Sequence, residues 1–223
     1  MTMHDASTRI QFHFLTIVPF GAALLLLAFL LYGCEQKAAE QAAPKQTITN
    51  ENLQTAYAKQ MRHSHMYARF IRQAGKENLP NVANLYRAMS RSEAIHAENH
   101  AALLRKRGLE PRTLLYDSVA VGTIVQSFKM AISSEEIESE SMFPNLIRTA
   151  GLEKDTLAMT QFQQTMEADN RQNELFRDAS DRQGRIPKVP YLLCPACGYI
   201  ITSESTDECP LCHTVKSNFE KVS

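Results

Sequence analysis

The sequence has no excess charge of either sign and few cysteines. Its 24 basic residues are balanced by 24 acidic ones, so no electrostatic footprint argues for binding to nucleic acid. Among 223 residues there are only 5 cysteines, four of them in two Cys-x-x-Cys pairs near the C-terminus and the fifth, Cys34, alone. This distribution argues against a disulfide framework and indicates a metal site and one special cysteine.

The sequence has one long apolar run, from Phe12 to Tyr32. About 20 apolar residues span a bilayer, and Leu31-Tyr32-Gly33-Cys34 resembles a bacterial lipobox. Residues 1–33 are therefore predicted to be a signal peptide or membrane segment, and residues 34–47 a tether. Either a lipid on Cys34 or an uncleaved N-terminal helix would anchor the chain to the membrane of the cell envelope, facing the periplasm or the exterior.

Between residues 48 and 184, four stretches place apolar residues at helical spacing, with polar residues on the same stripe near the middle of each. Burying a carboxylate among apolar side chains is costly unless something pairs with it, and a metal ion is one such partner. Glu-x-x-His on a bundle helix is half of a di-iron carboxylate site. The inward polar residues are Gln60, Glu93, His96, Glu135, Glu138, Asp169 and Gln172.

We therefore predict a mainly α protein in which residues 48–184 form a four-helix bundle with a buried polar site. A single inward Glu or Gln is often satisfied by hydrogen bonds alone, and a centre held only by such bonds is the alternative. Four polar centres, one in each predicted helix, favour a metal site over that alternative.

Residues 185–223 carry the two cysteine pairs, Cys194-Pro195-Ala196-Cys197 and Cys209-Pro210-Leu211-Cys212. Two such turns can close a tetrahedral site of four thiolates around one ion. Zinc and iron both accept four thiolates, so the spacing does not decide the metal. Zinc would make this domain a structural staple, and iron would make it a one-electron carrier.

Taken together, these motifs resemble the rubrerythrin family, in which a ferritin-like di-iron bundle precedes a rubredoxin-like iron domain. The resemblance covers about residues 49–223. Its most specific parts are Glu93-x-x-His96, Glu135-x-x-Glu138 before Phe143-Pro144, Cys194-x-x-Cys197-Gly198-Tyr199 and Cys209-Pro210-x-Cys212.

The resemblance implies that the four-cysteine iron passes electrons to a bundle iron site, where peroxide is reduced. In that reading Glu93, His96, Glu135 and Glu138 are catalytic metal ligands, and Asp169 is a further ligand. The resemblance also implies a homodimer and an electron donor that the sequence does not identify.

The chain departs from the family pattern at two places. Gln60 stands where the family has a glutamate, and Asp169-x-x-Gln172 replaces Glu-x-x-His on the fourth helix. Amides are poor iron ligands, and aspartate is one methylene shorter than glutamate. In the small domain, His213 stands where rubredoxins usually have glycine, which keeps zinc open as the metal there.

Three occupancies of the bundle are compatible with this altered ligand set. Two irons would need water or His63 to fill the gaps. One metal would bind at Glu93, His96 and Glu138. A metal-free bundle would be held by carboxylate–amide hydrogen bonds with some carboxylates protonated. In that last case, the protein would be a non-catalytic rubredoxin-like electron-transfer or metal-binding protein.

Overall fold

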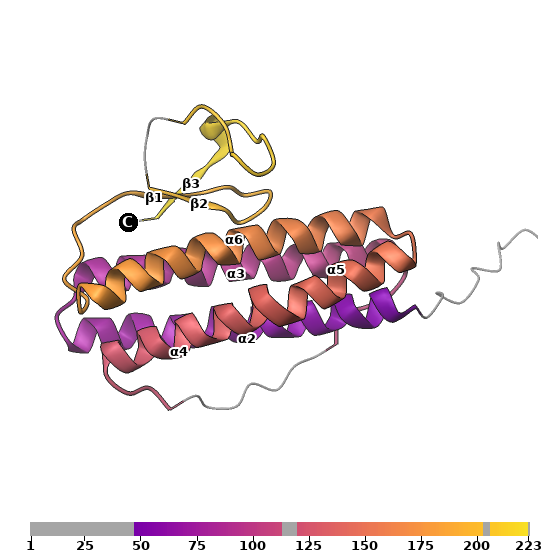
Figure 1. The fold of residues 1–223 in the computed structure, drawn as a ribbon. Coiled ribbons are helices and arrows are strands. Elements are labelled where there is room, and N and C mark those ends of the chain that lie inside the picture. The colour runs from indigo at the N-terminus through magenta and orange to yellow at the C-terminus, as the bar shows by residue number, and fades with distance from the viewer. Residues whose placement is uncertain (1–46, 113–119, 203–205, 223) are drawn as a thin grey trace, which may run out of the picture. The chain divides into compact units, whose positions relative to one another are not determined.

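The computed structural model describes residues 47–112, 120–202 and 206–222, and most of them lie in a bundle of four long helices (Figure 1). The mainly α, ferritin-like fold predicted from the sequence is thereby confirmed. The apolar run, Cys34 and the tether up to residue 46 lie outside the described residues. Among the helices that the structure describes, none is long and apolar enough to cross a membrane. The helical elements are α2 Ile48–Lys76, α3 Pro80–Lys106, α4 Ile124–Ile137, η1 Glu138–Met142, α5 Phe143–Leu152 and α6 Thr156–Asp181.

Helices α2 and α3 form the first hairpin of the bundle. Thr47 caps α2 by accepting a hydrogen bond from the backbone N–H of Asn50 at 3.1 Å, and Pro80 begins α3, where its missing N–H costs nothing. The turn between them places Asn78 in the left-handed region with a φ of 57°, which asparagine tolerates better than most residues. A three-residue turn is thus sufficient to join α2 and α3, which pack against each other.

The third long helix is continuous but irregular. It begins with a capping box in which Thr123 and Gln126 satisfy each other's backbone N–H groups. The α-helical turns then widen into the π-helix η1 directly before Pro144, which has no N–H for an α-helical bond and crowds the preceding turn. Because Glu138 is the first residue of η1, the irregular turn begins at one of the predicted metal ligands.

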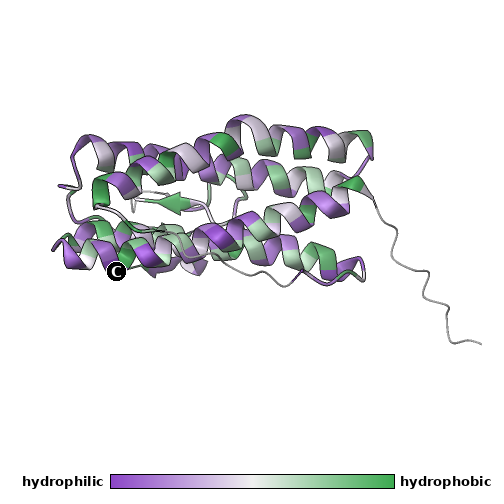
Figure 2. Cartoon of the chain, turned by 90° about the horizontal axis from the view of Figure 1, so that it is seen from below, coloured by the Kyte–Doolittle hydropathy of each residue, from purple (hydrophilic) through white to green (hydrophobic). Residues whose placement is uncertain are grey.

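Two apolar clusters flank the polar centre. One contains Tyr67, Tyr86 and Phe176, and the other contains Leu53 and Phe162. Along α2 the second cluster comes before the polar residues and the first comes after them, so the polar centre has packed apolar side chains on both sides. Figure 2 shows hydrophilic and hydrophobic residues interspersed along every helix, as expected for helices with one buried face.

The C-terminal residues form a small sheet that packs on the bundle. Its strands are β1 Tyr191–Leu193, β2 Ile200–Ile201 and β3 Glu220–Val222, antiparallel in the order β2-β1-β3, with a short 3-10 helix, η2, at Lys216–Asn218. Strands β1 and β3 contact α3, and β2 contacts α6 (Figure 1). The predicted domain boundary at residue 184 falls within one compact unit, residues 44–223, and stays a prediction.

Candidate metal centres

The first group of potential ligands in the bundle comes from α3 and α6. Glu93 and His96 are one turn apart on α3, and Asp169 reaches them from α6; all three are fully or almost fully buried. His96 Nδ1 lies 3.3 Å from Asp169 Oδ1 and 3.8 Å from Glu93 Oε2. One ligand atom from each residue lies within 4.8 Å of the others, so the three suit a single metal ion.

The second group comes from α2, α4 and η1. His63 Nε2 lies 3.0 Å from Glu138 Oε1, and His63 Nδ1 lies 3.5 Å from Glu135 Oε1. These three residues are also buried and within the same 4.8 Å limit. The structure therefore groups Glu138 with His63 and Glu135, and it separates Glu138 from the trio of Glu93, His96 and Asp169.

The two glutamines turn their amide N–H groups toward the carboxylates. Gln60 Nε2 donates to Glu138 Oε2 at 3.2 Å and to Asp169 Oδ2 at 3.4 Å, which links the two groups. Gln172 Nε2 donates to Glu93 Oε1 at 2.5 Å and to Asp169 Oδ1 at 3.4 Å. Both glutamines therefore hold carboxylates in place, and the amide nitrogens that face the site cannot bind a metal.

The crowding of buried acids shifts their pKa values upward. Burial raises the pKa of Glu138 to about 7 and that of Asp169 well above its usual range. Burial lowers the pKa of His63, but the carboxylates of Glu138, Glu135 and Glu93 together outweigh that effect and the result is about 9. For His96, burial likewise lowers the pKa, and the nearby carboxylates of Asp169 and Glu93 together outweigh it and give a pKa of about 10. Without a metal, bound protons supply the positive charge that the carboxylates require.

The donor atoms fit a metal ion. Glu93 Oε2 and Glu135 Oε2 are buried and have no hydrogen-bond partner among the described residues, and neither do the Nδ1 atoms of His63 and His96. Unsatisfied buried polar atoms are rare in native proteins and call for an explanation. Carboxylate oxygens and imidazole nitrogens from facing helices are the ligands of di-iron bundle proteins, so divalent metal ions explain these atoms.

Several neighbours support the ligands, and the sequence did not mark them as part of the site. The Tyr67 hydroxyl donates to Glu135 Oε1, and Lys59 Nζ lies 3.3 Å from Glu138 Oε1. Ser134 Oγ lies 2.8 Å from His63 Nε2. Lys59 comes one residue before Gln60, and Ser134 one residue before Glu135, so proximity in sequence to an inward polar residue was the available signal.

The four cysteines of the small domain come together as predicted. Cys194 Sγ and Cys212 Sγ are 3.4 Å apart, and Cys197 Sγ and Cys209 Sγ are 3.5 Å apart. All four sulfur atoms lie within 4.8 Å of one another, which suits one tetrahedral ion. A hydrogen bond from the Cys197 thiol lowers the pKa of Cys194 to about 4 and favours its thiolate.

The residue after each cysteine pair has a left-handed backbone. Gly198 has a φ of 76° and His213 a φ of 60°. Glycine adopts this region without strain, whereas histidine does so at a cost. His213 Nδ1 lies 2.9 Å from Glu208 Oε1, a contact that helps to hold the second turn. The substitution of glycine by His213 is therefore compatible with the four-cysteine geometry.

Helix α3 binds the first cysteine turn through three successive carbonyl groups. Asn99 donates to the Ala196 carbonyl at 2.8 Å, and Ser92 donates to the Gly198 carbonyl at 2.6 Å. Between them, His96 Nε2 lies 3.1 Å from the Cys197 carbonyl oxygen. A ligand of the bundle group thus forms a hydrogen bond with a residue of the four-cysteine group.

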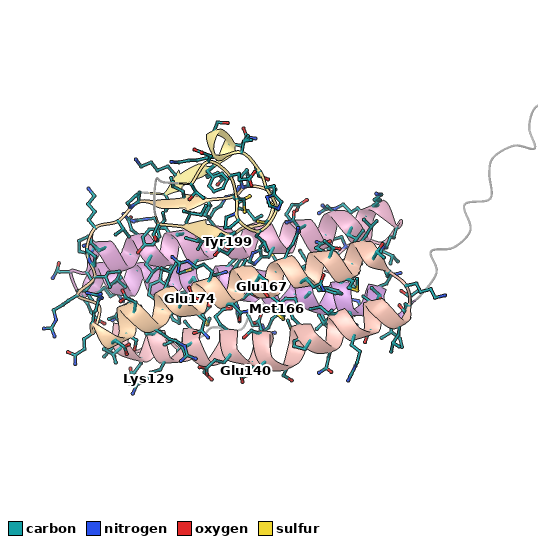
Figure 3. All side chains as sticks on the ribbon, turned by 45° about the horizontal axis from the view of Figure 1, so that its top comes forward. Lys129, Glu140, Met166, Glu167, Glu174 and Tyr199 are labelled. Carbon is teal, nitrogen blue, oxygen red and sulfur yellow. The ribbon has the colours of Figure 1, made fainter. Side chains whose placement is uncertain are left out.

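Helix α6 supports the same small domain from its other side. Arg171 donates through Nε to the Ile200 carbonyl at 3.4 Å and through Nη2 to Thr202 Oγ1 at 3.3 Å. Figure 3 shows Tyr199 above α6, near Glu167 and Glu174. The small domain therefore rests on two helices that also supply the ligands Glu93, His96 and Asp169.

Comparison with known proteins identifies the family. Residues 51–180 match the family model described as Rubrerythrin. The chain is 29% identical to rubrerythrin-2 of Clostridium acetobutylicum, over 79% of this chain and 97% of that protein. It is 27% identical to nigerythrin of Nitratidesulfovibrio vulgaris, over 77% of this chain and 85% of that protein. A solved structure of nigerythrin in its fully reduced, all-ferrous state superposes with a TM-score of 0.72 at 26% identity, over 82% of this chain and 91% of that one. Since the family model spans more than half of the sequence, this chain belongs to the rubrerythrin family.

Proposed function

We propose that this chain reduces peroxide at the bundle centre with electrons that arrive through the four-cysteine site. Membership of the family supports a non-haem iron protein. The observation that carries the proposal is the pair of buried ligand groups, each with one imidazole and two carboxylates, joined through His96 to the four-cysteine turn. Peroxide reduction consumes two electrons and two protons for each hydrogen peroxide and releases two waters.

The residues of the chain have distinct parts in this reaction. Ferrous ions, when bound, would supply the two electrons that break the O–O bond. The carboxylates of Glu93, Asp169, Glu135 and Glu138 would hold those ions, and Tyr67 fixes one Glu135 oxygen through its hydroxyl. The apolar clusters on both sides of the centre exclude bulk water, which strengthens electrostatic interactions inside it.

Lys59 connects the centre to the surface. It lines a surface cavity of about 350 Å³ together with Gln54, Arg62 and Arg112, and its side chain is 30% exposed. Its ammonium group also lies 3.3 Å from Glu138 Oε1. The surface cavity beside Lys59 is therefore our proposed entry route for peroxide and for the two protons that the reaction consumes.

Electrons return through the contact between the small domain and α3. An iron held by the four cysteines would be a one-electron carrier. The hydrogen bond from His96 to the Cys197 carbonyl joins a bundle ligand directly to a residue of the four-cysteine group, and Ser92 and Asn99 hold the same turn in place. Two one-electron transfers along this link would restore the reduced centre.

The experiment uses the full chain in detergent, loaded with ferrous iron and reduced without oxygen. One equivalent of hydrogen peroxide should be consumed for each bundle centre, followed by growth of the thiolate-to-iron absorption of the four-cysteine site. Asp169→Ala should abolish peroxide consumption, whereas Glu167→Ala, on the exposed face of the same helix, should leave it unchanged. A wild-type chain that binds bundle iron but leaves peroxide intact would refute the proposal.

The hydrogen bonds of the glutamines favour a second candidate function. Gln60 and Gln172 satisfy carboxylates that a metal would otherwise bind, as a metal-free bundle requires. The chain would then be a non-catalytic electron carrier or metal-binding protein. The triple change Gln60→Glu, Asp169→Glu and Gln172→His separates the two functions. Peroxide turnover that appears only in the triple variant would favour the inert bundle, and turnover already present in the native chain would favour the enzyme.

Location and assembly are further proposals. The apolar run Phe12–Tyr32 and the lipobox-like residues before Cys34 support a membrane-anchored protein of the cell envelope. The native chain should incorporate a labelled fatty acid, and Cys34→Ser should not. If neither chain incorporates the label, an uncleaved N-terminal helix is favoured. Homodimer formation, proposed from the family resemblance, is tested by light scattering of the detergent-solubilised chain.

A further inference from the structure

His63 occupies a position on α2 that corresponds to none of the family ligands named above. It lies one turn after Gln60, is 1% exposed and points at two carboxylates of the third long helix. The family pattern instead predicts the second histidine on the fourth helix, where this chain has Gln172. The imidazole missing from α6 is thus matched by an additional buried imidazole on α2.

The two histidines of the centre are alike in that Nε2 has a hydrogen-bond partner and Nδ1 has none among the described residues. His96 Nε2 bonds to the Cys197 carbonyl oxygen, and His63 Nε2 bonds to Ser134 Oγ and also lies near Glu138 Oε1. In both rings Nδ1 is buried, faces carboxylates and has no hydrogen-bond partner among the described residues. Metal-binding histidines characteristically donate one ring N–H to a neighbour and present the other nitrogen to the ion.

The remaining ligands divide evenly between these two imidazoles. Glu93 and Asp169 lie with His96, while Glu135 and Glu138 lie with His63. Four ionised carboxylates and two neutral imidazoles balance the charge of two divalent cations. Gln60 donates to a carboxylate of each group and so keeps the two groups next to each other.

We propose that His63 is a metal ligand and that the bundle binds two divalent cations, one at His63, Glu135 and Glu138 and one at Glu93, His96 and Asp169. This inference rests on the proposed function, because it specifies the ligands of the same centre. It assigns the role of the absent α6 histidine to a different helix. Gln172 serves as a hydrogen-bond donor to Glu93 and Asp169 and not as a ligand.

Metal counting with zinc tests the inference without any catalytic assay. The full chain should bind about three zinc ions, one at the cysteines and two in the bundle. His63→Ala should bind about two, and His63→Ala combined with Asp169→Ala about one. His65→Ala, which alters an exposed histidine two residues away, should retain the wild-type number.

A second measurement is independent of mutant folding. In the wild-type chain, nitrogen NMR of the histidine rings should show the Nδ1 signal of His63 shifting when bundle zinc binds. His63→Gln, which retains a polar side chain, serves to assign that signal. Three zinc ions in both His63 variants, or an unchanged Nδ1 signal in the loaded wild type, would overturn the inference alone. A wild-type chain that binds only the cysteine zinc would refute the proposed function together with it.

Discussion

At Gly198, the contact between the four-cysteine turn and helix α3 leaves no room for an added methyl group. A Cβ atom added there would lie 2.6 Å from His96 Cδ2, and closer still to Nε2. The residue also has a φ of 76°, which disfavours every side chain. Gly198→Ala therefore combines a backbone cost of about 1–2 kcal/mol with an overpacking cost of about 1–3 kcal/mol.

Gly108→Ala is the matched control for the backbone cost. Gly108 has a φ of 73°, but an added Cβ would meet nothing within 4 Å. Its substitution should therefore lower the free energy of unfolding by the backbone cost of about 1–2 kcal/mol alone. Urea unfolding of the full chain, followed by circular dichroism and by the absorption of the four-cysteine metal, measures both variants. If Gly198→Ala were no more destabilising than Gly108→Ala, the close packing of the cysteine turn on His96 would be refuted.

Three further predictions concern the bundle centre. Tyr67→Phe leaves a buried Glu135 oxygen without its donor and should lower the free energy of unfolding by about 1–3 kcal/mol, measured by thermal denaturation. Lys59→Met should slow peroxide consumption without changing the metal content, whereas Arg69→Met, on the outer side of the same helix, should change neither. Folding raises the pKa values of His63 and His96, so the metal-free chain gains stability from proton binding that is fully present below about pH 6.5 and is lost as pH rises through about 9–10. Denaturation between pH 6 and pH 10 should show this loss, and zinc loading should reduce it.

The sequence alone was sufficient to predict the bundle and its buried polar residues. Periodicity placed Gln60, Glu93 and Glu135 on inward faces, and all three are fully buried. This succeeded because a helix that buries one stripe fixes the orientation of every residue on that stripe. The cysteine spacing likewise predicted the four-sulfur cluster, since two tight turns leave few ways of arranging the sulfur atoms.

The sequence was less informative about how the inward residues pair. Periodicity placed Glu93, His96 and Glu138 on inward faces but did not show that Glu138 approaches His63 instead of His96. The π-helical turn η1 begins at Glu138 and shifts the directions of the side chains that follow it on the third long helix. A pattern based on about 3.6 residues per turn does not include this shift. The contact of His96 with the Cys197 carbonyl also joins residues that are 101 positions apart, and local pattern carries no information about such a pairing.

The residues at positions 60, 63 and 172 are consistent with one another when the six proposed ligands are considered together. A buried glutamate at position 60 would add a fifth carboxylate beside Glu138 and Asp169, whose pKa values burial already raises. Gln60 instead donates to both of them, so the position stabilises the negative charges. In the ligand set proposed above, the second imidazole comes from His63 on α2 and not from position 172 on α6. Gln60 and Gln172 then act as hydrogen-bond donors to the carboxylates of both groups.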